Sequence, residues 1–183
     1  MSERKILVYD LPSENQILIN NIAIKEKIKA KRVRAIQLLH SLGLQCTESV
    51  IIIPKEKFSK IDNIISKVNE IYNSLKNDND IRELDINLEP IIKVLDLTIE
   101  QTNQLIEIAK RRLIESLDNA INRVSEILDN LNQIAEEERR KRILRNLRRL
   151  RSNWGDIFEI ANKLGIDITR DYEYLINLID SVL

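Results

Sequence analysis

Three consecutive pieces of sequence decide the fold: KILVYDLP (residues 5–12), VRAIQLLHSLGLQ (33–45) and CTESVIIIP (46–54). The first and the last are short apolar runs, rich in β-branched residues and closed by proline, which predicts two strands. Between them, residues 25–42 predict a helix with Gly43 at its end. Strand, helix and strand in this order predict a βαβ unit or half of an α+β domain. The apolar side of the predicted helix consists of Val33, Ile36, Leu39 and Leu42.

The following segment, residues 55–75, is the most regular amphipathic helix of this half of the chain. Its apolar stripe has members three or four residues apart, as one face of a helix requires. These members are Phe58, Ile61, Ile65, Val68, Tyr72 and Leu75. Residues 76–90 are polar and acidic and predict a loop, with a short strand at 81–84 as an option. Residues 91–97 are apolar again and predict the last strand.

The amino-acid composition limits the classes of protein to which this chain can belong. The chain has 183 residues, of which 43% are hydrophobic and 32% charged, so a packed core and a highly charged surface are both expected. The formal net charge is zero, so any contact with nucleic acid requires a local basic patch. Cys46 is the only cysteine, which excludes an internal disulfide, and no apolar run is long enough to span a membrane. We therefore expect a cytoplasmic protein with no membrane partner and no cofactor.

From residue 99 the pattern changes to heptads, in which apolar residues alternate spacings of four and three. The first seam contains Leu113, Leu117, Ala120, Val124, Ile127, Leu131 and Ile134. The second contains Ile143, Leu147, Leu150, Trp154, Ile157, Ala161, Leu164 and Ile168. The two seams are out of phase, which favours an antiparallel hairpin of two helices that turns within residues 129–138, with one uninterrupted helix as the alternative. Gly155 lies inside the second seam and weakens the prediction of an unbroken helix there, and Gly165 is placed to end that helix. A short final helix, packed on the base of the hairpin, is predicted from Tyr172, Leu175, Ile176 and Ile179.

The N-terminal half resembles a group of ferredoxin-like domains. The residues that carry this resemblance are Val8-Tyr9-Asp10 at a strand end, an Arg34-containing helix that ends at Leu42-Gly43, and Ser49-Val50 in a strand that ends at Pro54. This stretch is similar to the small subunit of the CRISPR spacer-acquisition complex, to the N-terminal domain of chromate-resistance regulators and to the C-terminal module of phenylacetate-type repressors. The prolines at 12 and 54 favour the regulators. The resemblance covers residues 4–98 and implies a βαββαβ domain; the insertion at 13–25 and the acidic loop depart from it.

Asp10 is the candidate catalytic and metal-binding residue. In the CRISPR subunit that this stretch resembles, the matching aspartate lies at a dimer interface and can bind a divalent metal for phosphodiester cleavage. A pair of carboxylates across a two-fold axis could hold Mg²⁺ and activate water. The alternative, which we favour, is that the Asp10 side chain accepts hydrogen bonds from backbone amides of the turn that follows the strand.

A basic run in the second half is the candidate nucleic-acid interface. It contains Arg139, Arg140, Lys141, Arg142, Arg145, Arg148, Arg149 and Arg151, with no acidic residue between them. On a helix, Lys141, Arg145, Arg148 and Arg149 share a face at spacings of three and four, which could follow a line of phosphates. The alternative is a solvated flank of the hairpin, paired with the acids at 136–138 or with acids of the neighbouring helix. Aromatic residues make up only 4% of the chain, which disfavours stacking on single-stranded bases.

The predicted architecture is therefore α+β: a ferredoxin-like domain at residues 1–98 and a helical coiled-coil hairpin with a short last helix at 99–183. We predict a non-enzymatic protein that binds DNA or RNA or regulates, and that assembles as a homodimer or with a protein partner through its coiled coil. The homodimer rests on the heptad seams and on open sheet edges. The alternatives are a metal-dependent nuclease built on Asp10 and a purely structural oligomerisation module.

Overall fold

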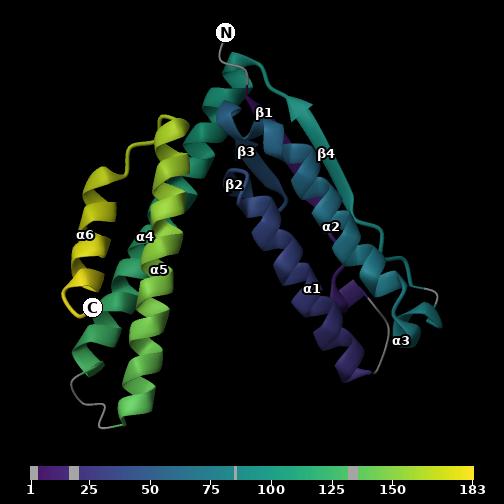
Figure 1. Cartoon of the computed structure of the whole chain (residues 1–183). Coiled ribbons are helices and arrows are strands. Elements are labelled where there is room, and N and C mark those ends of the chain that lie inside the picture. Colours follow the sequence, from purple (N-terminus) through teal and green to yellow (C-terminus); the bar gives the residue numbers. More distant parts are fainter. Residues whose placement is uncertain (1–3, 17–20, 85, 132–135) are drawn as a thin grey trace. The chain divides into compact units, whose positions relative to one another are not determined.

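The computed structural model describes residues 4–16, 21–84, 86–131 and 136–183 (Figure 1). It has two compact units, an N-terminal unit of residues 1–105 and a C-terminal unit of residues 106–183. The division falls within a long helix, a few residues beyond the predicted boundary at 98. The predicted α+β class is confirmed, because a four-stranded antiparallel sheet and long helices are both present. No helix in the described part of the chain has both the length and the apolar character needed to cross a membrane.

A four-stranded sheet forms the centre of the N-terminal unit. Its strands are β1 (Lys5–Asp10), β2 (Leu44–Thr47), β3 (Val50–Ile53) and β4 (Ile91–Asp96). They lie in the order β2-β3-β1-β4, and each neighbouring pair is antiparallel. The apolar runs at both ends of the opening stretch thus become neighbouring strands, as their composition predicts. The strand order leaves β2 and β4 as the two edges of the sheet within the described residues.

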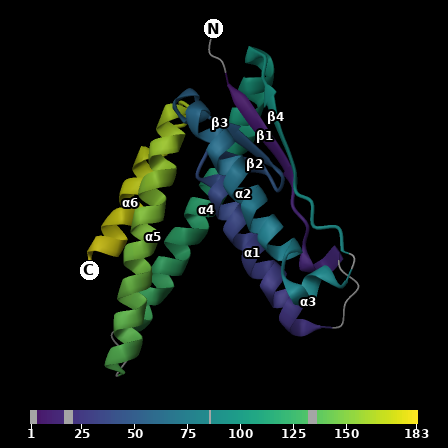
Figure 2. The same ribbon diagram turned by 45° about the vertical axis from the view of Figure 1, so that its right-hand side comes forward.

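Two helices cover one face of this sheet (Figure 2). Helix α1 spans Ile22–His40, and α2 spans Ile61–Lys76 after a 3₁₀ segment at Lys55–Lys60. Leu7 of β1 and Val68 of α2 belong to one buried apolar cluster with residues of α1 and β3. Alternation of side chains along a strand places Leu7 and Tyr9 of β1 in this cluster, so the sheet and the helices share a core.

Helix α1 differs from its prediction at both ends and on its apolar face. It begins at Ile22 rather than near 25, because Asn21 caps it: its Oδ1 accepts a hydrogen bond of 3.0 Å from the Ala23 amide. The buried stripe contains Ile24, Ile28, Ala35 and Leu39. The placement of Val33 in that stripe was wrong, since 46% of its surface is exposed. The prediction was based on the apolar residues in the last turns of α1. The buried face also contains Ile24 in the first turn, and it is this residue that shows which side of α1 faces the core.

Gly43 has a different role from the predicted helix terminator. Helix α1 ends at His40 with Ser41 as its cap, and Gly43 does not have the positive φ of a left-handed end residue. A Cβ at Gly43 would instead lie 2.0 Å from the backbone oxygen of Ile52. Glycine is therefore required because β3 approaches the chain closely at the point where it enters β2.

The acidic segment contains a short helix where a strand was an option. Helix α3 spans Asn79–Arg82 and buries Ile81. Asp78 caps it, with an Oδ1 that accepts a hydrogen bond of 3.2 Å from the Asp80 amide. The run Asn-Asp-Asn-Asp (residues 77–80) therefore caps a helix and does not form a loop that leads into a strand. The reason is that an aspartate side chain readily accepts a hydrogen bond from the backbone amide two residues later.

The C-terminal unit consists of helices. Helix α4 spans Ile99–Leu131 and crosses from the N-terminal unit, α5 spans Glu137–Lys163 and α6 spans Thr169–Asp180. Within this unit α4 and α5 are separate helices that lie side by side in opposite directions in both views (Figures 1 and 2). The buried residues of the first seam are Leu113, Leu117, Ala120, Val124 and Leu131, and those of the second are Leu147, Trp154, Ala161, Leu164 and Ile168. Ile134, the last residue of the first seam, lies outside the described residues.

Helix α5 is continuous through Gly155 and ends at Lys163, with Leu164 as its cap and Gly165, the glycine predicted to terminate it, directly after the cap. Gly165 has φ 78°, its amide donates to the Asn162 carbonyl at 3.0 Å, and the Ile166 amide donates to the Ala161 carbonyl at 2.9 Å. These two bonds are the Schellman arrangement, which satisfies carbonyls that the helix end leaves open. The turn brings α6 back along α5, against which it packs.

Candidate nucleic-acid interface

All eight residues of the predicted basic run lie on α5, within its first four turns. Their side chains are all exposed, and the acids of the first turn, Glu137 and Glu138, precede them. The helix forms here because the segment is rich in Arg, Leu and Ile, while the seam residue Leu147 is buried on the opposite side. Burial of the seam thus turns the arginines toward solvent.

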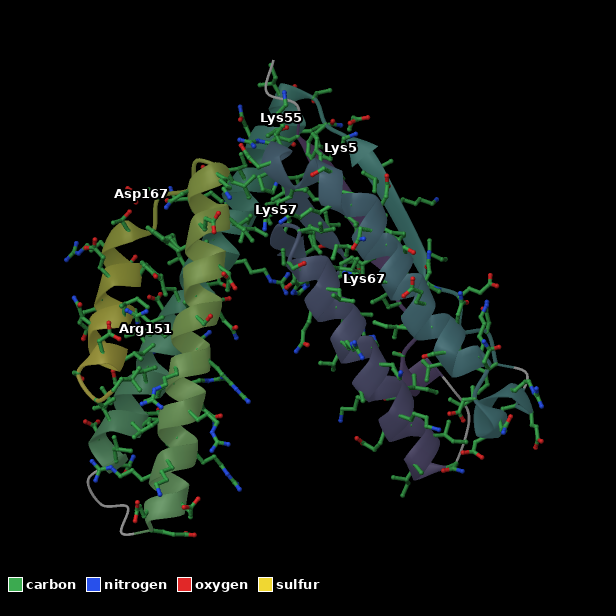
Figure 3. All side chains as sticks on the ribbon, in the orientation of Figure 1. Lys5, Lys55, Lys57, Lys67, Arg151 and Asp167 are labelled. Carbon is green, nitrogen blue, oxygen red and sulfur yellow. The ribbon has the colours of Figure 1, made fainter. Side chains whose placement is uncertain are left out.

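Two of the eight residues are engaged in ion pairs. Lys141 Nζ lies 2.9 Å from a carboxylate oxygen of Glu137 and 3.4 Å from one of Glu138. Arg151 binds Asp180 of α6 with two hydrogen bonds, of 2.7 Å from Nε and 3.0 Å from Nη2 (Figure 3). The bidentate geometry is the strong form of an arginine–carboxylate contact, so Arg151 joins α6 to α5.

The other six arginines make no hydrogen bond or ion pair with the described part of the chain. These six are Arg139, Arg140, Arg142, Arg145, Arg148 and Arg149. Arg142, Arg145 and Arg149 are three and four residues apart and therefore share one face of α5. We call these three residues the arginine face. The predicted face consisted of Lys141, Arg145, Arg148 and Arg149; Lys141 is paired with two glutamates, and the arginine face differs from that set by having Arg142 and by leaving out Arg148.

Carboxylates partly offset the charge at one end of α5. Glu136 and Glu138 line a shallow surface depression together with Arg139, Arg142 and Arg145. The next acid along α5 is Asp156. The positive charge is therefore least compensated at Arg148 and Arg149, which do not line that depression.

Aromatic side chains of α5 are not available to bases. Trp154 is buried on the seam. The Phe158 ring stacks on Tyr172 of α6, with 4.1 Å between ring centroids and 6° between their planes. Contact with nucleic acid through α5 would therefore rest on guanidinium groups and not on stacking with aromatic rings.

Asp10 is the last residue of β1 and lies opposite Ile91 of β4. Its carboxylate is exposed and accepts no hydrogen bond from the described residues, so the predicted cap of the following turn is not seen. Among the described residues of one chain, no group of three His, Cys, Asp or Glu could hold a metal ion. The Mg²⁺ role of Asp10 stays a prediction, and it would need carboxylates from a second copy.

Tyr72 marks a polar corner beside Asp10 that the sequence did not reveal. Its hydroxyl donates to the Pro12 carbonyl at 3.2 Å and so joins α2 to the turn after β1. Burial raises the pKa of Tyr72 to about 12; the nearby Arg32 opposes this rise, and the negative charges of Glu14 and Asp10 add to it. In sequence Tyr72 is only one member of an apolar stripe, so nothing distinguished it.

A second buried tyrosine positions the only histidine. The Tyr9 hydroxyl donates to the Glu48 carbonyl at 2.8 Å and lies 3.2 Å from His40 Nε2. Because the hydroxyl proton is used on Glu48, Nε2 of His40 is the donor to the tyrosine oxygen. The contact ties the end of α1 to the β2–β3 turn and is structural.

Comparison with family models, with curated proteins and with solved structures finds no match to this chain.

Proposed function

We propose that the protein is a non-enzymatic nucleic-acid-binding protein whose arginine face follows the phosphate backbone of a duplex. The observation that carries this is the set of six exposed arginines on α5 with no partner among the described residues. Exposed arginines are costly to crowd without counter-charges, and phosphate oxygens are the anions whose geometry the planar guanidinium matches best.

The chemistry of the arginine face favours a duplex read without sequence preference. Neighbouring turns of a helix are about 5.4 Å apart, so Arg142, Arg145 and Arg149 can each reach a phosphate along one strand. Single-strand binders combine such a face with aromatic platforms, and on α5 both aromatic rings are already packed. Guanidinium groups keep their charge at every physiological pH, so binding should be insensitive to pH and steeply sensitive to salt.

For the N-terminal unit we propose the ferredoxin-like arrangement, and a cytoplasmic location for the whole chain. What supports the fold is the succession β1, α1, β2, β3, α2, β4 together with the sheet order β2-β3-β1-β4. This unit would serve as the assembly and regulatory part, and α5 as the binding part. Assembly with a protein partner through the coiled coil is an alternative use of the same helices.

The test is the salt dependence of binding to a duplex of mixed sequence. Arg145→Gln with Arg149→Gln should weaken binding and lower the slope of log affinity against log salt by about 1.8, because two phosphate contacts are lost. The matched control is Arg111→Gln with Arg123→Gln on α4, exposed residues of the same unit with the same charge change. The control should leave the slope unchanged.

Two results would contradict the proposal. An equal loss of slope in both double variants would assign binding to overall charge rather than to the arginine face. Wild-type protein that fails to bind duplex or single strands at low salt would remove the nucleic-acid function and leave the structural module. Circular dichroism on every variant separates these results from a loss of folding.

A further inference from the structure

Strand β4 is an edge of the sheet that presents apolar side chains to solvent. Ile91 is 55% and Leu95 49% exposed, and both lie on the face of β4 that points away from α1 and α2. Both views show β4 at the margin of the N-terminal unit (Figures 1 and 2). An open edge strand with exposed aliphatic residues is a template for pairing with another strand.

Hydrogen bonds elsewhere in the sheet identify the free backbone groups of β4. The Leu97 amide donates to the Arg4 carbonyl at 3.1 Å, and the Tyr9 amide donates to the Ser49 carbonyl on the other side of β1. Groups along a strand point alternately to its two sides, so residues 91, 93 and 95 bond to β1. The amides and carbonyls of Ile92, Val94 and Asp96 therefore point outward.

We propose that two copies of this chain pair along β4, antiparallel, about a two-fold axis through Val94 and perpendicular to the sheet. In this register Val94 faces the partner's Val94, and Ile92 faces the partner's Asp96. All three outward-pointing residues of each copy then sit at hydrogen-bonded positions, which no other two-fold register of this strand achieves. The result is one continuous sheet of eight strands.

The side chains of β4 agree with that register. Lys93 faces the partner's Leu95 rather than the partner's Lys93, so no like charges stand directly opposite each other. A shift of the axis to Lys93 or to Asp96 would bring identical charges together. The charged residues thus exclude two of the neighbouring registers and are compatible with the register that the backbone groups favour.

The interface also decides against the nuclease alternative. Asp10 is at the register of Ile91, three residues from the axis, and β1 is one strand further from it than β4. The two Asp10 carboxylates would be separated by about 14 Å across the strands and about 20 Å along them, hence by roughly 25 Å. One metal ion binds oxygen ligands at about 2–2.6 Å, so the two carboxylates could not share it.

The register can be tested by disulfide cross-linking between two single variants, Lys93→Cys and Leu95→Cys. Residue 93 and the partner's residue 95 form a non-hydrogen-bonded pair with Cα atoms about 4.5 Å apart, which a disulfide can span. Identical positions are diagonal, at about 7–8 Å, and cannot be bridged without backbone movement. Mild oxidation should therefore cross-link a mixture of the two variants and neither variant alone. Cys46 is buried, so the wild-type chain serves as the blank.

Sedimentation gives the second measurement. The wild-type chain should sediment at twice its 21.4 kDa mass. Leu95→Lys, which faces the partner's Lys93, should weaken the dimer on the order of tenfold, whereas Leu95→Glu should keep or tighten it. A monomer at the highest soluble concentration overturns the proposal. Equal effects of the two Leu95 changes, or cross-linking of a single variant as fast as the mixture, also overturn it. No residue of α5 takes part, so this failure is distinct from a failure of duplex binding.

Discussion

One substitution, glycine to alanine, should have opposite effects at two positions of this chain. At Gly43 the new Cβ would lie 2.0 Å from the oxygen and 2.8 Å from the carbon of the Ile52 carbonyl. Both are backbone atoms, so relief requires a shift of about 1 Å in β3 and a weaker β2–β3 ladder. We expect a loss of about 3 kcal/mol in the free energy of unfolding, at the upper end of the usual cost of overpacking.

Gly155→Ala is the matched control. Gly155 lies inside α5, and its Cβ would meet the Tyr172 hydroxyl at 3.8 Å, an ordinary contact. Replacing a helical glycine by alanine should add about 1 kcal/mol to the free energy of unfolding. Urea unfolding followed by circular dichroism measures the first change. Fluorescence of Trp154, the only tryptophan, reports on the C-terminal unit and measures the second. A neutral Gly43→Ala, or two changes of the same sign, would refute this reasoning.

Two further predictions concern titratable groups. Hydrogen bonds from Arg151 lower the pKa of Asp180, so the stability from this pair is present above the unfolded pKa of about 3.9 and is lost as pH falls through the lower folded pKa. Asp180→Asn should thus lower the urea midpoint at pH 7, and this difference should shrink as pH falls below about 4; a constant difference would contradict the ion pair. For Tyr72, absorbance titration should show one tyrosine that ionises near pH 12 and is absent in Tyr72→Phe. Because the folded pKa is raised, its stability contribution is intact below the unfolded pKa of about 10 and is lost progressively as pH rises toward the folded pKa of about 12. Tyr72→Phe should cost about 1 kcal/mol at pH 7, since the Pro12 carbonyl loses its donor.

The fold class followed from the sequence because short apolar runs and heptads are local signals. Prolines at 12 and 54 bound the strands, and the phase change between the two seams separates α4 from α5. Close approaches between distant segments leave no such signal. Gly43 was assigned to a helix end, although the atom that requires glycine there belongs to Ile52, and Val33 was assigned to a face that only the packing of Ile24 determines.

The basic run was visible in sequence, and so was one set of its possible partners. The acids at 136–138 were the expected partners in the alternative interpretation, and Lys141 pairs with Glu137 and Glu138, three and four residues away. Arg151 binds Asp180, which lies twenty-nine residues downstream on α6, and no local sequence pattern predicts this pair. The set of arginines without a partner among the described residues is therefore smaller than the basic run, because two of its eight charges, Lys141 and Arg151, are used within the fold.

The sheet order sets a waiting time during synthesis of the chain. Strand β1 is made first, yet its neighbours are β3, which ends at Ile53, and β4, which ends at Asp96. At about 5–20 residues per second, the second edge of β1 stays unpaired for roughly 4–17 s after the strand has been made. Until β3 is complete at Ile53, the hydrophobic segment Ile6–Leu7–Val8 has no strand to pair with, and from then on it is paired on one side only. A chain whose synthesis stops before residue 91 would thus keep its central strand open on one side, which makes such fragments candidates for chaperone capture and for aggregation.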